Sequence, residues 1–251
     1  MEFRRIFDTI PEQFDKYRVH YSAELFGHFI SKAGITVNST VLELGPGTGQ
    51  NTEPVLDTGC SYIGIELGDN FARVLRQKYA HRKNFTLIHD DFITHDFGNM
   101  RFDAIYSAAT IQWIPEDIAF SKTFALLKPG GVLAMMKLQG DYRTPNETLY
   151  RRIQQVYDLW FKPSQSYDRT FVYEHALNYG FEDFQRQDFH GQRLLTADDY
   201  VNYCGTHSDH LALKEPFKSK FFEGLRAAVV EFGGSLVFND TYVLMTVRKP
   251  L

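Results

Sequence analysis

The residues best suited to chemistry are three glycines at positions 45, 47 and 49, which follow a short apolar run at 41–44. That run is too short for a helix and predicts a buried parallel strand, although it holds one acid, Glu43. Glycines after such a strand let the backbone turn sharply and lie against a ligand with no Cβ in the way. The stretch therefore predicts a ligand-binding loop.

The spacing of the glycines bears on the kind of ligand. A dinucleotide-binding loop reads G-x-G-x-x-G, and its last glycine opens a helix whose N-terminus holds a pyrophosphate. Here the third glycine comes one residue early, and Pro46 separates the first two. An amino-acid ligand that carries a thioether or a sulfonium needs no phosphate-binding loop. It needs backbone contacts, and a carboxylate that can accept hydrogen bonds from its amino group. The loop thus favours such a ligand over a nicotinamide dinucleotide, which would place its ribose on Glu66.

Further polar and small residues fall where predicted strands end. Glu66 ends the second strand, where a carboxylate can accept both hydroxyls of a ribose. After the third strand, Asp91 can accept an adenine amino group and Phe92 can stack on the ring. Ser107 and Ala108 follow the fourth strand. Their small side chains leave space for the methionine-like part of a sulfonium ligand and for an incoming substrate. Taken singly, Glu66 could equally be an ordinary acid at the end of a strand, and Asp91 could equally be a residue that forms a turn. Together they indicate one site, because ligands of open parallel sheets bind at the carboxyl ends of strands.

The elements that must position these residues alternate along the first half of the chain. Strands are predicted at 41–44, 61–67, 85–89, 102–106 and 131–136. Helices are predicted at 50–57 and 69–79, with Asp69 as the N-cap of the second. Strands separated by helical stretches of about 10–15 residues imply right-handed βαβ units and a parallel sheet.

The second half changes character after Gly140. The spacing predicts helices at 151–160, 197–204 and 216–232, a polar loop at 163–169, and strands at 181–189 and 241–248. The stretch between Gly140 and Gly234 holds more than the core pattern needs, so we expect a cap over the binding site there.

The order of these motifs resembles the class I S-adenosylmethionine (SAM)-dependent methyltransferases over nearly the whole chain. The matching runs are VLELGPGTG at 41–49, YIGIE at 62–66, HDDF at 89–92, FDAIYSAATIQWI at 102–114 and LLKPGGVL at 126–133. Gln112 with Trp113, and FDKYR at 14–18 ahead of Tyr21, resemble the trans-aconitate-methyltransferase-like branch, which methylates small molecules. That branch reads Y-D-x-x-R-P-x-Y-P near the N-terminus, whereas this chain has Val19 and Ser22 in place of the prolines.

The resemblance implies an α/β fold: a Rossmann-like, doubly wound, seven-stranded sheet, mostly parallel, with an antiparallel C-terminal strand at 241–248 and a helical cap inserted in the C-terminal half. One domain, 1–251, is then expected. Its parts are N-terminal lid helices at 1–36, a cofactor-binding core at 37–139, a cap and substrate region at 140–235, and a final strand at 236–251.

The resemblance also implies methyl transfer from SAM, which leaves S-adenosylhomocysteine. The cofactor would be bound by Tyr17, Arg18, Tyr21, Glu43, Gly45, Pro46, Gly47, Thr48, Gly49, Glu66, Leu67, Asp90, Asp91, Phe92, Ser107 and Ala108. Arg18 would pair with the methionyl carboxylate, although it also suits a surface arginine. The acceptor pocket would be lined by Gln112, Trp113, Tyr142 and His207.

Methyl transfer from a sulfonium is an in-line displacement with a good leaving group, so orientation and exclusion of water are the expected contributions. An ionised carboxylate acceptor needs no base, whereas a phenol, an amine or an acidic carbon does. His20, His207 and His210 are base candidates, and each also suits a structural histidine. No residue is assigned as catalytic from the sequence.

Composition and absent motifs narrow the partners. A net charge of −4 argues against a nucleic-acid partner, and the Asp/Asn-Pro-Pro-Tyr/Phe sequence of nucleic-acid and glutamine N-methyltransferases is lacking. Cys60 and Cys204 lie far apart, and no acidic cluster suggests a metal. No run reaches about 18 apolar residues, so no membrane partner is expected. We expect a cytoplasmic monomer or homodimer acting on a small-molecule acceptor. The alternatives are a SAM-binding protein without methyl transfer and a nicotinamide-dependent oxidoreductase.

Overall fold

The computed structural model describes residues 2–166 and 170–251. The chain divides into two compact units, which are described separately. Unit 1 comprises Met1–Arg18, Gln139–Asp168 and His190–Thr241, and unit 2 comprises Val19–Leu138, Arg169–Phe189 and Tyr242–Leu251. The cofactor-binding core expected from the sequence, apart from its last residue, falls in unit 2.

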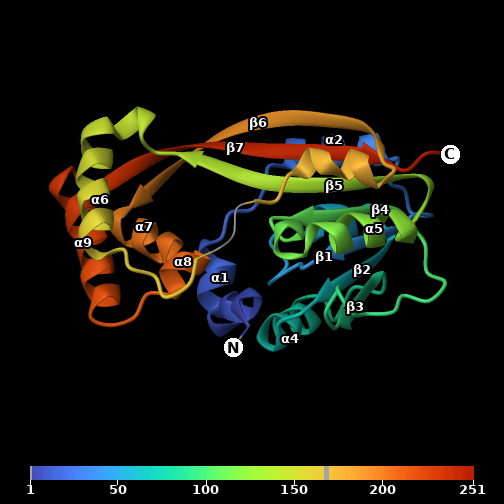
Figure 1. Ribbon diagram of the computed structural model, residues 1–251, viewed down its shortest axis with the longest axis horizontal. Helices are drawn as coiled ribbons and strands as arrows, with labels where there is room; N and C mark the ends of the chain where they lie inside the picture. Colours follow the sequence, from blue (N-terminus) through green and yellow to red (C-terminus); the bar gives the residue numbers. More distant parts are fainter. Residues whose placement is uncertain (1, 167–169) are drawn as a thin grey trace. The chain divides into compact units, whose positions relative to one another are not determined.

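The described strands form one seven-stranded sheet in the order β3-β2-β1-β4-β5-β7-β6 (Figure 1). Their bounds are β1 Thr40–Leu44, β2 Ser61–Glu66, β3 Phe85–His89, β4 Phe102–Ala108, β5 Leu127–Asp141, β6 Glu182–Thr196 and β7 Ser235–Arg248. The strands β1 to β5 run parallel to one another, and the C-terminal strands are antiparallel. The fold predicted from the sequence is therefore confirmed.

The register aligns the carboxyl ends of the central strands. Leu44 is paired with Ile65, and Glu43 is paired with Tyr106. The residues that follow β1, those that end β2 and those that end β4 consequently lie at one edge of the sheet. The strand order reverses between β1 and β4, which is where an open α/β sheet binds its ligand.

Both faces of the sheet in unit 2 are buried, which explains the near-continuous apolar strands. Leu42 and Leu44 belong to one hydrophobic cluster, which includes Phe120. Val41 and Tyr106 belong to the other. Successive side chains of a strand point to opposite faces, so β1 contributes to both clusters.

The helices of unit 2 begin and end at recognisable local signals. They are α2 Ala23–Ala33, α3 Glu53–Leu56, α4 Asp69–Lys78 and α5 Glu116–Leu126, with shorter 3-10 turns η2 Ile111–Trp113 and η4 Tyr173–Tyr179. Helix α2 is capped by Ser22, whose side chain accepts a hydrogen bond from the Leu25 N–H at 3.2 Å. It ends at Gly34, whose φ of +63° is the left-handed conformation that glycine adopts without strain.

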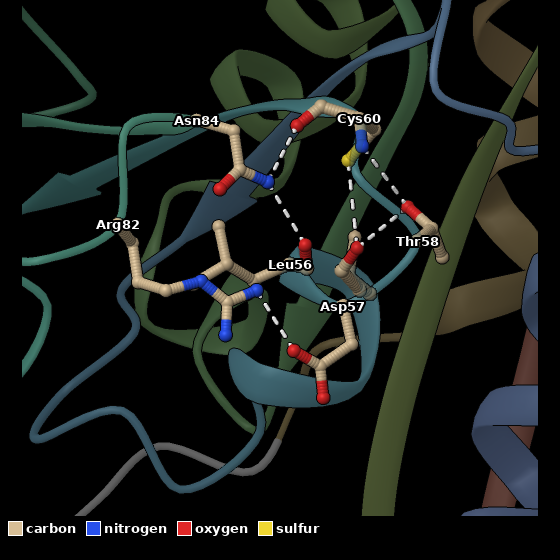
Figure 2. Close-up of polar contacts among 7 residues, drawn as sticks. Leu56, Asp57, Thr58, Cys60, Arg82 and Asn84 are labelled. Carbon is tan, nitrogen blue, oxygen red and sulfur yellow. Dashed lines mark hydrogen bonds and ion pairs between the residues drawn. The ribbon is translucent and has the colours of Figure 1, made fainter.

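A side-chain amide ties the segment before β3 to the turn before β2. Figure 2 shows Asn84 donating to the carbonyl oxygens of Leu56 at 2.9 Å and Cys60 at 3.0 Å. Arg82 reaches the same turn through an ion pair with Asp57 at 2.8 Å. These contacts fix the start of β2 against β3 and so support the position of Glu66 at the other end of the strand.

Two details of the predicted helices in unit 2 are wrong. The helix predicted at 50–57 is confined to α3 at 53–56, because residues 47–52 form turns. Asp69 is the first residue of α4, not its N-cap; Gly68 is the cap residue, and no side chain caps it. The Asp69 carboxylate instead lies 3.0 Å from Nε2 of His89.

The helices of unit 1 are α1 Pro11–Tyr17, α6 Glu147–Trp160, α7 Ala197–Cys204, α8 Ser208–Leu211 and α9 Phe217–Glu231, with 3-10 turns η1 Phe3–Thr9 and η3 Thr144–Asn146. Helix α9 packs against α6 and α7 (Figure 1). The helices predicted at 151–160, 197–204 and 216–232 are thus present with small shifts. The loop predicted at 163–169 has no helix or strand at 163–166, and its last three residues lie outside those described.

The outer strands are longer than predicted. β5 extends from 127 to 141, β6 reaches 196, and β7 begins at 235. The added part of β6, at 190–196, carries mostly polar side chains and two leucines with no buried position among them, so a strand pattern does not mark it. Among the described helices, none combines the length and the apolar character that crossing a bilayer requires.

Candidate functional site

The loop that follows β1 is held in a conformation that requires glycine. Gly45, Gly47 and Gly49 have φ values of +63°, +62° and +86°, where residues with a Cβ are strained. Pro46 and Thr48 between them are buried. The predicted ligand-binding loop is therefore a backbone surface at the carboxyl end of β1.

Glu66 lies at the last position of β2, as the sequence predicts. Its Oε2 accepts a hydrogen bond from the Gly47 N–H at 2.9 Å, and its Oε1 accepts one from the Gly68 N–H at 2.8 Å. The side chain is only 6% exposed. The carboxylate thus fixes the glycine loop, and a carboxylate is also a group that can accept hydrogen bonds from ligand hydroxyls.

A contact between loops joins the carboxyl ends of β1 and β4. A Cβ built on Gly45 would lie 2.4 Å from Cγ2 of Thr110, and the Thr110 hydroxyl donates to the Gly45 carbonyl oxygen at 3.1 Å. Ala109, just before it, has a positive φ of +59° without being glycine. The sequence did not single out Thr110, since a threonine in a loop carries no distinctive signal by itself.

Glu43 is buried within a network of hydrogen bonds and does not lie at the exposed edge of the sheet. Its Oε2 accepts hydrogen bonds from the hydroxyls of Tyr62, Tyr106 at 2.7 Å and Thr52 at 2.7 Å. Burial raises the pKa of Glu43 above its ordinary value, and the three hydroxyl hydrogen bonds oppose that rise only in part. The network joins β1, β2 and β4 through one carboxyl group.

The acids of the segment after β3 make hydrogen bonds within that segment and so form its turn. The Asp91 carboxylate accepts from the Ile93 N–H at 2.9 Å, and that of Asp90 lies 2.8 Å from Nδ1 of His95. The hydrogen bond from His95 lowers the pKa of Asp90. Phe92 is buried against Phe97, with ring centroids 5.9 Å apart. The Asp91 carboxylate thus forms a turn, in agreement with the turn-forming interpretation of this residue.

Small residues end β4 as predicted, and one of them shapes the following turn. The hydroxyl of Ser107 accepts from the backbone N–H of Ile111 at 2.8 Å, and Ala108 is the last residue of the strand. In the 3-10 turn η2, the Gln112 side chain donates to the Ala109 carbonyl at 3.0 Å. Trp113 lies in the same turn and is half-buried.

The start of unit 2 contacts the turn that continues from the glycine loop. The Tyr21 N–H donates to the side-chain oxygen of Asn51 at 2.9 Å, and the Tyr21 ring lies 5.8 Å from that of Tyr242. Asn51 is buried, and no local signal in the sequence marks it. Leu67, directly after Glu66, is half-buried, and His20 is exposed.

The remaining predicted site residues belong to unit 1. Tyr17 ends α1, and the Arg18 guanidinium lies over the Phe14 ring at 5.2 Å. Tyr142 follows β5, within a group of aromatic rings that includes Tyr200 at 5.9 Å. The expected proximity of these residues and of His207 to the glycine loop stays a prediction.

His207 and His210 lie together in unit 1, at the beginning of α8. The Nδ1 atom of His210 is 2.7 Å from the Cys204 carbonyl oxygen, and its Nε2 is 3.0 Å from the Tyr157 hydroxyl. Burial lowers the pKa of His210 to about 4 and raises that of the Cys204 thiol to about 12. A neutral, doubly hydrogen-bonded imidazole is poorly placed to take a further proton near neutral pH.

The carboxyl ends of β1, β2 and β4 together present backbone groups, one fixed carboxylate and small side chains. Such a surface can hold a ligand through its ribose hydroxyls and through main-chain contacts. Residues 42–135, which include this surface, match a family model described as a methyltransferase domain.

Curated relatives agree with that match over a longer stretch. A sterol 24-C-methyltransferase from Candida albicans is 26% identical over 204 residues, which are 74% of this chain and 53% of that protein. A demethylmenaquinone methyltransferase from Tropheryma whipplei is 28% identical over 160 residues, 60% of this chain and 66% of that protein. The chain thus spans about half to two thirds of the length of these relatives.

Solved structures share the fold at lower identity. A phosphoethanolamine N-methyltransferase from Haemonchus contortus, in complex with S-adenosyl-L-methionine, has a TM-score of 0.61 and 17% identity, covering 100% of this chain and 60% of that chain. The cyclase SpnF has a TM-score of 0.55 and 17% identity, covering 94% of this chain and 84% of that chain. Likeness at this identity establishes the architecture, and a protein named as a cyclase shares it.

Proposed function

We propose that the chain transfers a methyl group from S-adenosylmethionine (SAM) to a small-molecule acceptor, and the match of residues 42–135 to a methyltransferase domain supports this. The observation that carries the proposal is the Glu66 carboxylate bonded to the glycine loop at the point where the strand order reverses. This places a hydroxyl acceptor beside the backbone of the glycine loop.

In this proposal Glu66 binds the ribose hydroxyls through its carboxylate oxygens, while Leu67 packs beside the sugar. The glycine loop, from Gly45 to Gly49, contacts the methionyl part through its backbone. Hydrogen bonds between a ligand and a charged group contribute about 1.5–3 kcal/mol each, so Glu66 is the strongest single anchor.

The adenine is proposed to lie against the segment after β3. Asp91 or Asp90 would accept from its amino group, and Phe92 would form an apolar wall. Ser107 and Ala108 at the end of β4 would leave room for the sulfonium and its methyl group. Tyr17, Arg18 and Tyr21 are proposed as a lid over the cofactor.

The reaction itself needs little from the chain. A lone pair of the acceptor forms a bond to the methyl carbon as the carbon–sulfur bond breaks, and that electron pair returns to sulfur, leaving neutral S-adenosylhomocysteine. The residues around the cofactor hold the two reactants in line and keep water out. The buried, hydrogen-bonded state of His210 favours an acceptor that is already ionised or easily deprotonated.

We propose a small acceptor because Gln112 and Trp113 follow β4 as they do in the trans-aconitate-methyltransferase-like branch. The curated relatives named above act on a sterol and on demethylmenaquinone, which are also small molecules. Gln112, Trp113, Tyr142 and His207 are proposed to line the acceptor pocket.

Calorimetry and a transfer assay test the proposal in turn. SAM and S-adenosylhomocysteine should bind in a one-to-one ratio, and NADH should not bind. Purified chain incubated with methyl-labelled SAM and a metabolite pool should then yield a labelled small molecule. Binding of SAM with no labelled product from any pool would identify a SAM-binding protein without methyl transfer. Binding of NADH in place of SAM would overturn the assignment.

A further inference from the structure

The described residues 90–101, which connect β3 to β4, form turns and irregular chain and include no helix (Figure 1). Parallel strands are usually joined through a helix, whose internal hydrogen bonds satisfy the main chain. The first part of this connection, 90–97, is the segment proposed to lie against the adenine. Because it has no helical ladder, its shape depends on its own turn and on contacts from other elements.

One side chain of α5 supplies such contacts. The Lys122 ammonium donates to the carbonyl oxygens of His95 at 2.6 Å and Ile93 at 3.2 Å. Its Nζ atom also lies 5.1 Å from the centroid of the Phe92 ring and 5.7 Å from that of Phe97. One cation thus binds two carbonyl groups and two aromatic rings of the same segment, and both kinds of contact are favourable for an ammonium group.

The charges near Lys122 are those of the connection itself. Burial lowers the pKa of Lys122 below its ordinary value, and the carboxylates of Asp91, Asp96 and Asp90 oppose that change. The ion pair between Asp90 and His95 is internal to the segment and joins partly exposed side chains, so it contributes little to stability. Lys122, by contrast, ties the segment to a helix of the core.

We propose that Lys122 is a positioning residue for the adenine of SAM, because it holds the segment at 90–97 and so sets where Asp91 lies. This rests on the proposed function, in which that segment binds the adenine. Lys122 acts through the two residues whose carbonyls it binds. The N–H of Ile93 donates to the Asp91 carboxylate at 2.9 Å, and the N–H of His95 donates to the Asp91 carbonyl oxygen at 2.8 Å. A shift of either residue would therefore move Asp91.

Calorimetry with two ligands tests this role without knowledge of the acceptor. The ligands are S-adenosylhomocysteine and its deamino analogue, in which hydrogen replaces the adenine amino group. The natural chain should bind S-adenosylhomocysteine more tightly, because an acid of the segment accepts from the amino group. Lys122→Met should weaken binding of S-adenosylhomocysteine about tenfold and binding of the analogue much less, so the preference should shrink. A merely structural loss would weaken both ligands equally.

Three further variants support the comparison. Lys122→Arg should restore most of the affinity, because a guanidinium group can also donate to two carbonyls and lie on aromatic faces. Lys83→Met removes the same charge from an exposed site of unit 2 and should change neither dissociation constant. Should Lys122→Met prove unfolded by circular dichroism, Lys122→Gln, which keeps an N–H donor but not the charge, serves for the same comparison.

Hydrogen exchange without ligand gives a second readout. Lys122→Met should speed amide exchange at 92–97, whereas Lys83→Met should not. An unchanged affinity of Lys122→Met for S-adenosylhomocysteine, or an equal loss for both ligands, would overturn the role of Lys122 and leave the proposed function standing. A natural chain that binds the two ligands equally would also overturn it. A natural chain that does not bind S-adenosylhomocysteine would overturn the proposed function itself.

Discussion

At the scale of single residues, Glu66 has two tasks. It accepts backbone hydrogen bonds from Gly47 and Gly68, and in the proposed complex it also accepts hydrogen bonds from the ribose hydroxyls. The carboxylate that would bind the sugar is therefore the same one that holds the glycine loop.

Replacing this side chain should affect both tasks. Glu66→Ala should weaken SAM binding by about 1–3 kcal/mol, which is roughly 5- to 150-fold, because hydrogen bonds to a charged group are lost. It should also lower the free energy of unfolding without SAM, because two buried N–H groups lose their acceptor. Calorimetry and urea unfolding measure the two effects. Glu53→Ala, at an exposed acid in α3, is the control and should change neither.

A second residue-scale prediction concerns Gly45. Gly45→Ala places a Cβ at φ +63° and within 2.4 Å of Thr110, whereas Gly34→Ala places one at the same φ with no atom within 4 Å. Gly34→Ala should cost about 1 kcal/mol of stability, and Gly45→Ala about 2–4 kcal/mol, since strain and collision add. Thermal and urea unfolding measure the difference. Thr110→Ala in the Gly45→Ala background should recover part of the loss; no recovery would contradict the collision.

Much of the candidate site could be predicted from the sequence, because glycine and strand-end acids carry strong local signals. The positions of Gly45, Gly47 and Glu66 follow from the strand pattern alone. Thr110 and Asn51 could not be predicted, since their importance depends on which loop lies opposite. The tautomer and partners of His210 depend likewise on α6, which is distant in sequence.

At the scale of elements, one carboxyl group joins three strands. Glu43 on β1 accepts from Tyr62 on β2 and Tyr106 on β4, in the interior of one face of the sheet. The strands themselves were predictable from their apolar runs. The full lengths of β6 and β7 were not, because pairing between long antiparallel strands is a tertiary effect and does not depend on local propensity alone.

Because the pKa of Glu43 is raised, the free energy of unfolding should depend on pH in a specific way. Between its ordinary value of 4.5 and the raised value, the folded chain holds a proton that the unfolded chain has released. This contribution to stability therefore falls as the pH rises through that interval and is constant above it. Glu43→Gln cannot titrate, so its stability relative to the natural chain should increase from pH 4.5 upward. Urea unfolding at several pH values measures this; a difference that is the same at every pH would contradict it.

At the scale of the whole molecule, the proposed cofactor residues fall in both units. The glycine loop, Glu66, the segment after β3 and the end of β4 belong to unit 2, while Tyr17 and Arg18 belong to unit 1. The proposed lid can be tested without knowledge of the acceptor, because an ordered ligand slows amide exchange in the backbone around it.

SAM should therefore protect two separate stretches from hydrogen exchange. At about 100 times its dissociation constant, SAM should stabilise the chain by about 2.7 kcal/mol. Exchange should slow at 45–52 and 66–68, and also at 11–18 if the first helices close over the cofactor. Exchange followed by mass spectrometry, with and without S-adenosylhomocysteine as a second ligand, measures this. Protection confined to unit 2 would remove Tyr17 and Arg18 from the cofactor site.

Thr110 fills the space that a side chain at position 45 would need, and this has a consequence for redesign. The turn after β4, which would help select the acceptor, packs against the loop that would bind the donor. Grafting a foreign 108–114 segment to change substrate preference should then disturb donor affinity as well, unless the incoming residue at 110 fits the same hollow. Donor and acceptor selectivity in this chain would have to be altered as a pair.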